Sequence, residues 1–469
     1  MTSQDVPNHS LARRARSRTR LDPARQIAFA ALRAVDDDDA YLNLTLPSLL
    51  AAAGLTGRDA ALATELANGT IRMQGLYDAM ISASLSGAPA SLQPEVLTAL
   101  RLGAHQLHGM RVPSHAAVGT SVELVREAVG ERPVRLVNAV LRRIGATPLD
   151  GWLETLAPRA TGGSVDDLVV RFSHPAWIVD AFADALTADG ADAAQLPRLL
   201  AADNEAPRVT LAARPGLTTV TALSSYDVRP GRFSPYAGIL GGGDPADLPE
   251  VRKGTVGVQD EGSQLAALVL ARASLDRRDT RWLDMCSGPG GKAALLTGLA
   301  RQRGATLVAA EMLPHRAVLV GRAVRAYPPP HALVVADGAA PAWRPGAFDR
   351  VLVDAPCTGL GALRRRPEAR WRRQPDDLRS LVPLQRRLLD SAIDSTRPGG
   401  VVAYVTCSPH RAETRGVVDA ILARRPDVQE DDARALLPQV DGTGPGPHIQ
   451  LWPHRHGTDA MFVALLRRR

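Results

Sequence analysis

The sequence predicts an α/β protein in which an all-helical domain precedes a domain built on a doubly wound parallel sheet. Apolar residues recur at intervals of three and four from about residue 22 to residue 147, which is the helical period. After residue 256, short β-branched runs alternate with helical stretches, as in a parallel α/β sheet. A length of 469 residues also favours two or three domains over one.

The first 21 residues are polar and rich in arginine, and they lack hydrophobic periodicity. We therefore expect residues 1–21 to form a disordered basic arm. A signal peptide is not expected, and no window approaches the ~18 apolar residues that would span a membrane. The chain has three cysteines, too few for a disulfide framework, so we expect a cytoplasmic protein with no membrane partner.

The basic residues are almost all arginine. Of 56 lysines and arginines only Lys253 and Lys292 are lysine, and the formal net charge is +7. Arginine binds phosphate through two parallel hydrogen bonds and stacks on bases, so this excess is consistent with a nucleic-acid partner. A GC-rich genome would produce the same arginine bias, and composition alone does not separate the two explanations.

The helical domain is expected over residues 22–148. The strings ARQIAFAALRAV, DAALATELANGTIR and PEVLTALRLGAHQL carry the helical period, and Asp22-Pro23 is typical of an N-cap followed by proline at the first helical position. Residues 149–164 are rich in glycine, proline and threonine, which predicts a linker. Residues 165–255 contain FSHPAWIVDAF and the alternating string APRVTLAARPG, which predict a small α+β connecting subdomain.

The last domain, expected over residues 256–469, has five strand-like runs: RWLDMC, TLVAAE, ALVVAD, RVLVDAP and VVAYVTC. In open parallel sheets, ligands bind at the carboxyl ends of the strands. The residues with useful chemistry fall at these ends, and they are Cys286, Glu311, Asp337, Asp354 and Cys407.

A glycine-rich turn, DMCSGPGGK, follows the first of these strands over residues 284–292. A phosphate-binding P-loop would need glycine where Cys286 stands and serine or threonine where Ala293 stands. A dinucleotide loop is formally satisfied, which leaves a nucleotide-dependent oxidoreductase as one alternative. However, Glu311 could accept both ribose hydroxyls and Asp337 an adenine amino group, which suits an adenosine without a pyrophosphate. S-adenosylmethionine is such a ligand.

Two cysteines, Cys357 and Cys407, follow the fourth and fifth strands. A cysteine at such a position is most often a packing residue. Two thiols facing one crevice beside the carboxylate of Asp354 fit another chemistry, which is methyl transfer to carbon 5 of a pyrimidine. A thiolate that adds to carbon 6 makes carbon 5 nucleophilic, and an acid near the ring nitrogen stabilises the charge that develops. The residues themselves leave open which cysteine attacks.

Two resemblances narrow these hypotheses. Residues 22–148 resemble the helical RNA-binding fold of the NusB family in ALATELANGTIR, LRLGAHQL, PSHAAVGTSVEL and VNAVLRRI. The C-terminal part resembles the Sun/Nop family of RNA cytosine-5 methyltransferases in VQDEGSQ (258–264), DMCSGPGGK (284–292), DAPCTGLGALRRRPEARWRR (354–373) and TCSPHRAET (406–414). The resemblance implies a Rossmann-like, S-adenosylmethionine-dependent methyltransferase domain behind an all-α NusB-like domain.

The Sun/Nop resemblance also implies residue roles. Cys407 would be the nucleophile, Cys357 would assist product release, and Asp354 and Lys292 would complete the catalytic group. The cofactor site would consist of Cys286, Ser287, Gly288, Pro289, Gly290, Gly291, Lys292, Glu311, Asp337 and Asp354. Where the family has a Glu-Asn pair after TCS, this chain has Glu413-Thr414, and we expect that departure not to affect the chemistry.

The implied substrate is a cytosine in 16S ribosomal RNA. A family member that acts on transfer RNA or another RNA is an alternative, as is a non-catalytic RNA-binding factor of ribosome assembly or antitermination. Residues 364–373 contain six arginines and lie shortly after the DAPC motif of Cys357. This position predicts a contact with the RNA backbone, although a run of arginines is more often a solvated surface. The histidines lack metal-ligand spacing, so no metal is predicted, and the oligomeric state stays open.

Overall fold

The computed structural model describes residues 22–38, 40–85, 91–110, 112–158 and 164–469, so the predicted arm over residues 1–21 lies outside the described residues. The chain divides into two compact units. The first comprises Met1–Thr70 and Ile81–Pro148, and the second comprises Ile71–Met80 and Leu149–Arg469. The short segment Ile71–Met80 therefore belongs with the C-terminal part of the chain.

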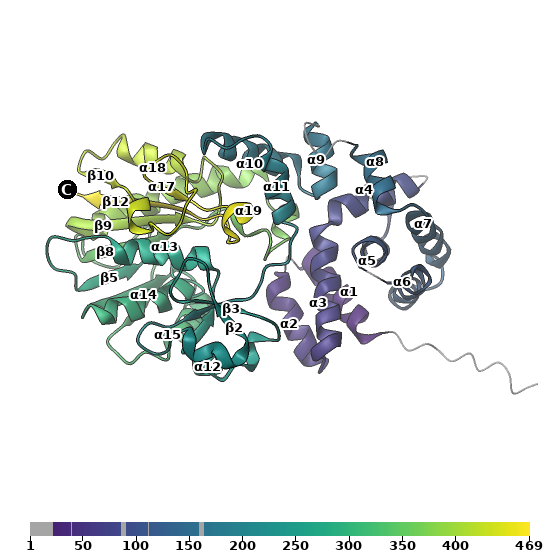
Figure 1. The fold of residues 1–469 in the computed structure, drawn as a ribbon, viewed down its shortest axis with the longest axis horizontal. Helices are drawn as coiled ribbons and strands as arrows, with labels where there is room; N and C mark the ends of the chain where they lie inside the picture. The colour runs from purple at the N-terminus through teal and green to yellow at the C-terminus, as the bar shows by residue number, and fades with distance from the viewer. Residues whose placement is uncertain (1–21, 39, 86–90, 111, 159–163) are drawn as a thin grey trace, which may run out of the picture. The chain divides into compact units, whose positions relative to one another are not determined.

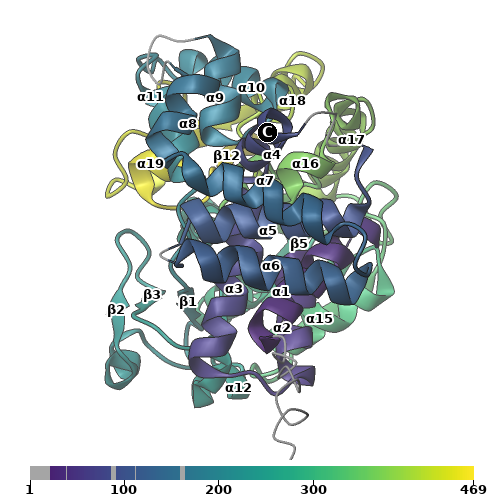
Figure 2. The ribbon, with the colours of Figure 1, turned by 90° about the vertical axis from the view of Figure 1, so that its right-hand side faces the viewer.

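The first unit is helical, as predicted (Figure 2). Its helices, two of which run into the segment Ile71–Met80, are α1 (Pro23–Asp37), α2 (Leu42–Ala52), α3 (Gly57–Arg72), α4 (Gln74–Ser84), α5 (Pro94–His108), α6 (Ser114–Ala128) and α7 (Val134–Ala146). The Asp22 carboxylate accepts a hydrogen bond from the Ala24 N–H, which confirms the predicted N-cap of α1. Helices α5, α6 and α7 pack against one another and bury Leu100 and Leu141 completely.

The second unit begins with four helices: α8 (Leu149–Leu156), α9 (Val165–Phe172), α10 (Ala176–Ala188) and α11 (Gln195–Ala202). Helix α8 occupies half of the stretch for which composition predicts a linker. Its Trp152 is only 7% exposed, so burial of this ring outweighs the glycine and proline content that follows. Helices α9, α10 and α11 bury apolar residues against Leu360 and Trp452 of the C-terminal part of the chain.

A small antiparallel sheet follows, with the strand order β2-β3-β1-β4. Its strands are β1 (Thr210–Ala213), β2 (Val228–Pro230), β3 (Ala237–Leu240) and β4 (Val256–Val258). The sequence analysis predicts only β1. Strand β4 pairs with β1 although it lies beyond residue 255, where the expected connecting subdomain ends. The short helix α12 (Pro249–Lys253) leads into β4.

The main sheet has the order β10-β12-β9-β8-β5-β6-β7, with β11 paired to β12. Five strands run parallel and coincide with the five predicted runs: β5 (Arg281–Asp284), β6 (Thr306–Glu311), β7 (Ala332–Val335), β8 (Phe348–Asp354) and β9 (Thr396–Thr406). Strands β10 (Val428–Asp431), β11 (Ile449–Gln450) and β12 (Phe462–Arg468) add an antiparallel extension that the sequence analysis does not predict.

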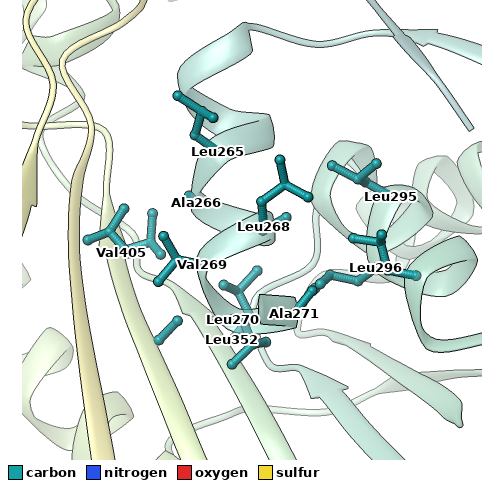
Figure 3. Packing of buried hydrophobic residues seen from close by; sticks show 14 of the residues in the cluster. Leu265, Ala266, Leu268, Val269, Leu270, Ala271, Leu295, Leu296, Leu352 and Val405 are labelled. Carbon is teal, nitrogen blue, oxygen red and sulfur yellow. The ribbon is translucent and has the colours of Figure 1, made fainter. Parts of the chain in front are cut away.

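Helices cover both faces of this sheet (Figure 1). On one side, α13 (Glu261–Arg272), α14 (Gly291–Gln302) and α15 (Pro314–Val324) contribute to a cluster that includes Leu352 and Val405 (Figure 3). On the other side, α17 (Leu378–Ser395) and α18 (Arg415–Leu422) pack against Val402 and Tyr404. Because successive strand residues point to opposite faces, β9 serves both clusters.

The strand order places a topological switch at the carboxyl ends of β5 and β8. The chain proceeds from β5 outward to β6 and β7, and then continues on the other side with β8 and β9. Ligands of doubly wound sheets bind at such a reversal. In the described ranges we found no helix that is both long enough and apolar enough to cross a membrane.

The fold gives a matched pair of leucines for a stability test. Leu352 of β8 is fully buried, whereas Leu333 of the edge strand β7 is 39% exposed. We expect Leu352→Ala to lower the free energy of unfolding by about 3 kcal/mol because it leaves a cavity in the core. Leu333→Ala should cost less than about 1 kcal/mol. Urea unfolding followed by circular dichroism measures both, and equal losses would contradict this description of the core.

Candidate active site

The glycine turn between β5 and α14 is shaped by close contacts. Gly290 has a φ of +111°, and a Cβ atom there would lie 2.6 Å from the Ala323 Cβ. A Cβ atom on Gly288 would lie 2.2 Å from Oε2 of Glu311. Both positions therefore need glycine, because the turn, which we call the glycine cradle, packs closely against Glu311 and against Ala323 of α15.

Glu311 ends β6 and is 5% exposed. Its Oε2 accepts a hydrogen bond from the Gly288 N–H at 3.0 Å, and its Oε1 accepts one from the Leu313 N–H at 3.0 Å. A carboxylate has about four acceptor positions, so each oxygen can accept a further hydrogen bond. Glu311 can therefore support the glycine turn and still accept from two hydroxyl groups of a ligand.

Arg316 is a residue of this site that the sequence analysis missed. Its Nη2 donates to the Gly288 carbonyl at 2.8 Å, and its Nε lies 3.8 Å from Oε2 of Glu311. The guanidinium thus bridges the glycine turn and the strand-end acid. In the sequence, the position of Arg316 in the first turn of the helix after Glu311 could have indicated its role.

Asp337 follows β7 and is exposed. Its Oδ1 accepts a hydrogen bond from the Ala339 N–H at 2.8 Å, which shapes the loop. This bond occupies one oxygen of the carboxylate and leaves acceptor capacity for a ligand.

Asp284, at the end of β5, is fully buried, and the sequence analysis does not single it out. No side chain in the described ranges hydrogen-bonds to its carboxyl group. Burial, followed by the charge of Asp354, raises the pKa of Asp284 to about 8. The group is therefore mostly protonated at neutral pH and can donate a hydrogen bond. In the sequence, the position of this acid at the start of the glycine turn could have identified Asp284 as a candidate site residue.

Lys292 and Asp354 form the ion pair of the site. The Lys292 Nζ donates to Oδ2 of Asp354 at 2.9 Å, and the two side chains are 11% and 26% exposed. Burial alone would lower the pKa of Lys292, but the charge and hydrogen bond of Asp354 outweigh it, so the pKa is raised. The two residues that the resemblance assigns to the catalytic group are thus in direct contact.

Cys357 and Cys407 follow β8 and β9, and their sulfur atoms are 3.4 Å apart. The hydrogen bond between them lowers the pKa of Cys407 and raises that of Cys357. Lys292 and Arg366 further lower the pKa of Cys407, against burial and the charge of Asp354. The site therefore favours a thiolate on Cys407 and a thiol on Cys357, a ranking that the sequence left open.

Cys286 has different surroundings from these two cysteines. It packs against the apolar cluster beneath the sheet edge. Burial, and then the charge of Asp284, raises the pKa of its thiol. This thiol stays protonated, so Cys286 contributes to the turn through its backbone rather than as a nucleophile.

Two members of the arginine run over residues 364–373 are structural, which corrects the predicted RNA contact for these two. Arg364 is 7% exposed and donates to the Gly457 carbonyl at 2.9 Å. Arg370 is fully buried and donates to the Asp203 carbonyl at 2.7 Å. Buried carbonyls and carboxylates need donors, and these arginines supply them instead of facing a phosphate backbone.

The donor set fits an adenosyl ligand. The glycine cradle carries no side chain at Gly288 or Gly290, and Glu311 and Asp337 retain acceptor capacity beside it. Asp354 adds a carboxylate at the end of the neighbouring strand β8. These groups suit ribose hydroxyls, an adenine amino group and a cationic tail, and they offer no cluster of cations for a pyrophosphate.

Comparison with known proteins decides the family. The family model described as 16S rRNA methyltransferase RsmB/F matches residues 271–467, and the NusB family model matches residues 22–146. A Mycobacterium tuberculosis protein, whose name gives a methyltransferase of unspecified substrate, is 53% identical over 96% of this chain and 97% of its own length. The ribosomal RNA small subunit methyltransferase B of Pseudomonas syringae is 32% identical over 94% of this chain and 96% of its own length.

The chain belongs to the RsmB/F family. As an RsmB/F protein it is an S-adenosylmethionine-dependent methyltransferase that acts on RNA. The Sun/Nop resemblance and the NusB-like domain predicted from the sequence are confirmed. The predicted arrangement, with a NusB-like domain in front of the methyltransferase, is that of proteins named ribosomal RNA small subunit methyltransferase B.

Solved structures support the fold of this RsmB/F protein. The crystal structure of the protein PH0851 has a TM-score of 0.77 and 20% sequence identity, and the match covers 95% of this chain and 99% of that chain. A methyltransferase homologue from Pyrococcus horikoshii has a TM-score of 0.52 and 20% identity, covering 66% of this chain and all of that chain. The predicted fold class, a helical domain followed by a Rossmann-like α/β domain, is confirmed.

Gly288 provides a test of the cofactor cradle. We expect Gly288→Ala to weaken binding of S-adenosylmethionine by about tenfold or more, because the added methyl group would displace Glu311. Gly321→Ala is the control, since its Cβ would make an ordinary 3.5 Å contact with Leu333. Isothermal titration calorimetry measures both affinities. Wild-type affinity in Gly288→Ala would exclude the cradle as the cofactor site.

Asp284 predicts a pH dependence of stability. Its pKa is raised to about 8 in the folded state, so the folded protein keeps a proton that the unfolded chain releases above its ordinary pKa of 3.8. This contribution to stability is present at low pH and is lost as pH rises toward 8. Between pH 5.5 and 8.5 the melting temperature of the wild type should fall roughly 2–4 °C further than that of Asp284→Asn. Parallel pH profiles of the two proteins would contradict the raised pKa.

Proposed function

We propose that this protein methylates carbon 5 of a cytosine in 16S ribosomal RNA through a covalent adduct with Cys407. The observation that carries the proposal is the 3.4 Å approach of two sulfurs, one of them favoured as a thiolate, beside the Lys292–Asp354 ion pair. The choice of RNA is supported by the names of the relatives, which include ribosomal RNA small subunit methyltransferase B.

The pair of thiols suits this reaction because carbon 5 of cytosine is a poor nucleophile. In the proposed first step, the Cys407 thiolate forms a bond to carbon 6, and the electron pair of the ring double bond becomes available at carbon 5. S-adenosylmethionine supplies the methyl group when it is bound. A base then removes the proton from carbon 5, the carbon 5–carbon 6 double bond re-forms, and Cys407 leaves as a thiolate. The target base must be extruded from any stack to reach these groups.

Lys292 and Asp354 are assigned to the pyrimidine ring. Addition of a thiolate to carbon 6 places negative charge on the ring nitrogen and its neighbouring oxygen. A buried ammonium held at 2.9 Å by a carboxylate is a pre-organised partner for that charge. Cys357 is assigned to product release, because its thiol lies beside the sulfur that must leave carbon 6.

The cofactor site is proposed to be the turn from Cys286 to Lys292 together with Glu311, Asp337 and Asp354. Its backbone would approach the ligand at Gly288 and Gly290, where the structure leaves no space for side chains. Glu311 would accept from the ribose hydroxyls and Asp337 from the adenine amino group. The thiol of Cys286 has no proposed part in the chemistry.

The alternative of a non-catalytic RNA-binding factor is disfavoured by the same observation. A scaffold needs neither two adjacent thiols of opposite protonation preference nor a buried ion pair beside them. A family member that acts on transfer RNA would have the same active site. The substrate experiment below distinguishes the two RNA classes.

Single replacements of the three cysteines test the mechanism. With labelled S-adenosylmethionine and either ribosomal or transfer RNA, Cys407→Ala should lose at least about 1000-fold in methylation rate, because the nucleophile is absent. Cys357→Ala should accumulate a covalent protein–RNA adduct, seen as a shifted band on denaturing gels. Cys286→Ala removes the third thiol and should still methylate RNA when S-adenosylmethionine is saturating. Lys253→Arg, at an exposed position at the end of α12, is the control and should methylate at the wild-type rate.

The outcomes separate the parts of the proposal. Undiminished methylation by Cys407→Ala would exclude the adduct, and normal turnover by Cys357→Ala would exclude its release role. Label on transfer RNA but not on ribosomal RNA would overturn the substrate. Mapping the labelled nucleotide to a position other than carbon 5 of cytosine would overturn the reaction.

A further inference from the structure

A buried carboxylate, Glu413, lies behind the two cysteines. It follows β9, six residues after Cys407, and it is fully buried. Its Oε1 accepts a hydrogen bond from the Thr358 N–H at 2.8 Å and another from Nε2 of Gln385 at 3.0 Å. Its Oε2 accepts from the Thr358 hydroxyl. The sequence analysis treats this residue as outside the chemistry.

Glu413 is held by neutral donors rather than by a cation. Among the described residues, no lysine or arginine forms an ion pair with its carboxylate. Burial lowers the pKa of the neighbouring His410, which keeps that ring neutral. The carboxylate accepts all three of its hydrogen bonds. Two of them come from Thr358, the residue after Cys357, through its backbone N–H and its hydroxyl.

A chain of hydrogen bonds connects the two cysteine loops through this carboxylate. The Thr358 and Ser408 hydroxyls are 3.1 Å apart, and each residue directly follows a cysteine. Because a hydroxyl has one hydrogen and a carboxylate only accepts, Thr358 donates to Glu413 and Ser408 donates to Thr358. The chain therefore runs from the Cys407 loop through the Cys357 loop and ends on Glu413.

Hydrogen bonds from two further residues hold Glu413 and the Cys357 loop in place. The Tyr404 hydroxyl, on β9, donates to the Glu413 carbonyl at 2.7 Å. Gln385, on α17, donates both to Glu413 and to the Pro356 carbonyl at 2.9 Å, directly before Cys357. Tyr404 and Gln385 are themselves fully buried, so the backbone of Glu413 is anchored to the core by Tyr404 and its carboxylate by Gln385.

We propose that Glu413 is a positioning residue, which ties the loop of Cys357 to the loop of Cys407 and thereby sets the distance and the proton exchange between the two sulfurs. The inference rests on the proposed function, in which these two thiols divide attack and release. Glu413 does not touch the substrate in this scheme. It acts through Thr358 and Ser408.

The electrostatic surroundings agree with this geometry. The bond to Cys407 comes first among the causes that raise the pKa of Cys357, and the charge of Glu413 adds to it. The carboxylate therefore supports a protonated Cys357, which in turn can donate to a thiolate on Cys407. Loss of Glu413 would therefore loosen the two cysteine loops and also reduce the difference in pKa between Cys357 and Cys407.

The test compares Glu413→Ala with a matched structural control. Asp349 is also fully buried and accepts from two backbone N–H groups, those of Thr280 and Arg281, but it lies at the opposite end of β8. Asp349→Asn should lower stability without affecting the cysteines. A second pair, Thr358→Val and Thr358→Ser, removes or keeps the hydroxyl that Glu413 binds, at nearly constant size.

The first readout is the alkylation rate of each thiol by iodoacetamide, followed by peptide mass spectrometry at pH 7. In the wild type Cys407 should react faster than Cys357. In Glu413→Ala and Thr358→Val the ratio of the two rates should fall by about tenfold. In Thr358→Ser and Asp349→Asn it should stay within about twofold of the wild type.

The second readout is methylation of RNA. Glu413→Ala and Thr358→Val should lose about 100-fold in kcat, the effect of a displacement of roughly 1 Å in a reacting group. The KM for RNA and the affinity for S-adenosylmethionine should stay within about threefold, because neither binding group is altered.

The two readouts also distinguish the failure of this inference from the failure of the proposed function. An unchanged alkylation ratio in folded Glu413→Ala or Thr358→Val, or an equal change in Asp349→Asn, would overturn the positioning role. A changed ratio with no methylation of any RNA by the wild type would overturn the proposed function and leave the coupling of the loops standing.

Discussion

The active site depends on the parallel pairing of β8 with β9. In this register Asp354 is opposite Val405, so the two strands end at the same edge of the sheet. Cys357 lies three residues beyond the first of these positions and Cys407 two residues beyond the second. A slip of the register by one residue would exchange the faces of every side chain and separate the sulfurs. The helices packed on both faces hold the register through the two apolar clusters.

The charges at this edge are arranged around one ammonium group. Glu311 and Asp354 lie beside the turn, and their negative charges disfavour a thiolate nearby. Lys292 opposes this effect, since it pairs with Asp354 and lowers the pKa of Cys407. Under the proposed function, the site has to bind a cationic cofactor, which acids favour, and to ionise a thiol, which they oppose.

Much of the fold could be predicted because it follows from local periodicity. The five parallel strands and the helices between them are each encoded by a continuous run, as with TLVAAE for β6. Most of the small sheet and the antiparallel extension escaped prediction because their strands gain stability from partners distant in the sequence, as when β12 pairs with β9. Helix α8 was hidden by the glycines and prolines around it, although Trp152 marked it as buried.

In the candidate site, too, positions that follow from a local motif could be predicted, whereas contacts between residues distant in the sequence could not. The strand-end positions of Cys357 and Cys407 are readable in the sequence. Their relative acidity depends on the hydrogen bond between the two sulfurs and on the charge of Lys292, which is distant from both in the sequence. Arginines after the DAPC motif suggested a surface for RNA, whereas Arg370 hydrogen-bonds a carbonyl 167 positions away. Such pairings carry no local signature, so only the folded chain reveals them.

The near absence of lysine has a practical consequence for chemical labelling. Apart from the α-amino group, amine-directed reagents have two targets in the whole chain. Lys253 is exposed at the end of α12, and Lys292 is 11% exposed within the active site. Modification of Lys253 therefore measures reagent access to the surface, and modification of Lys292 measures reagent access to the proposed active site. Lys253 thus serves as an internal reference for the labelling of Lys292 in the same protein.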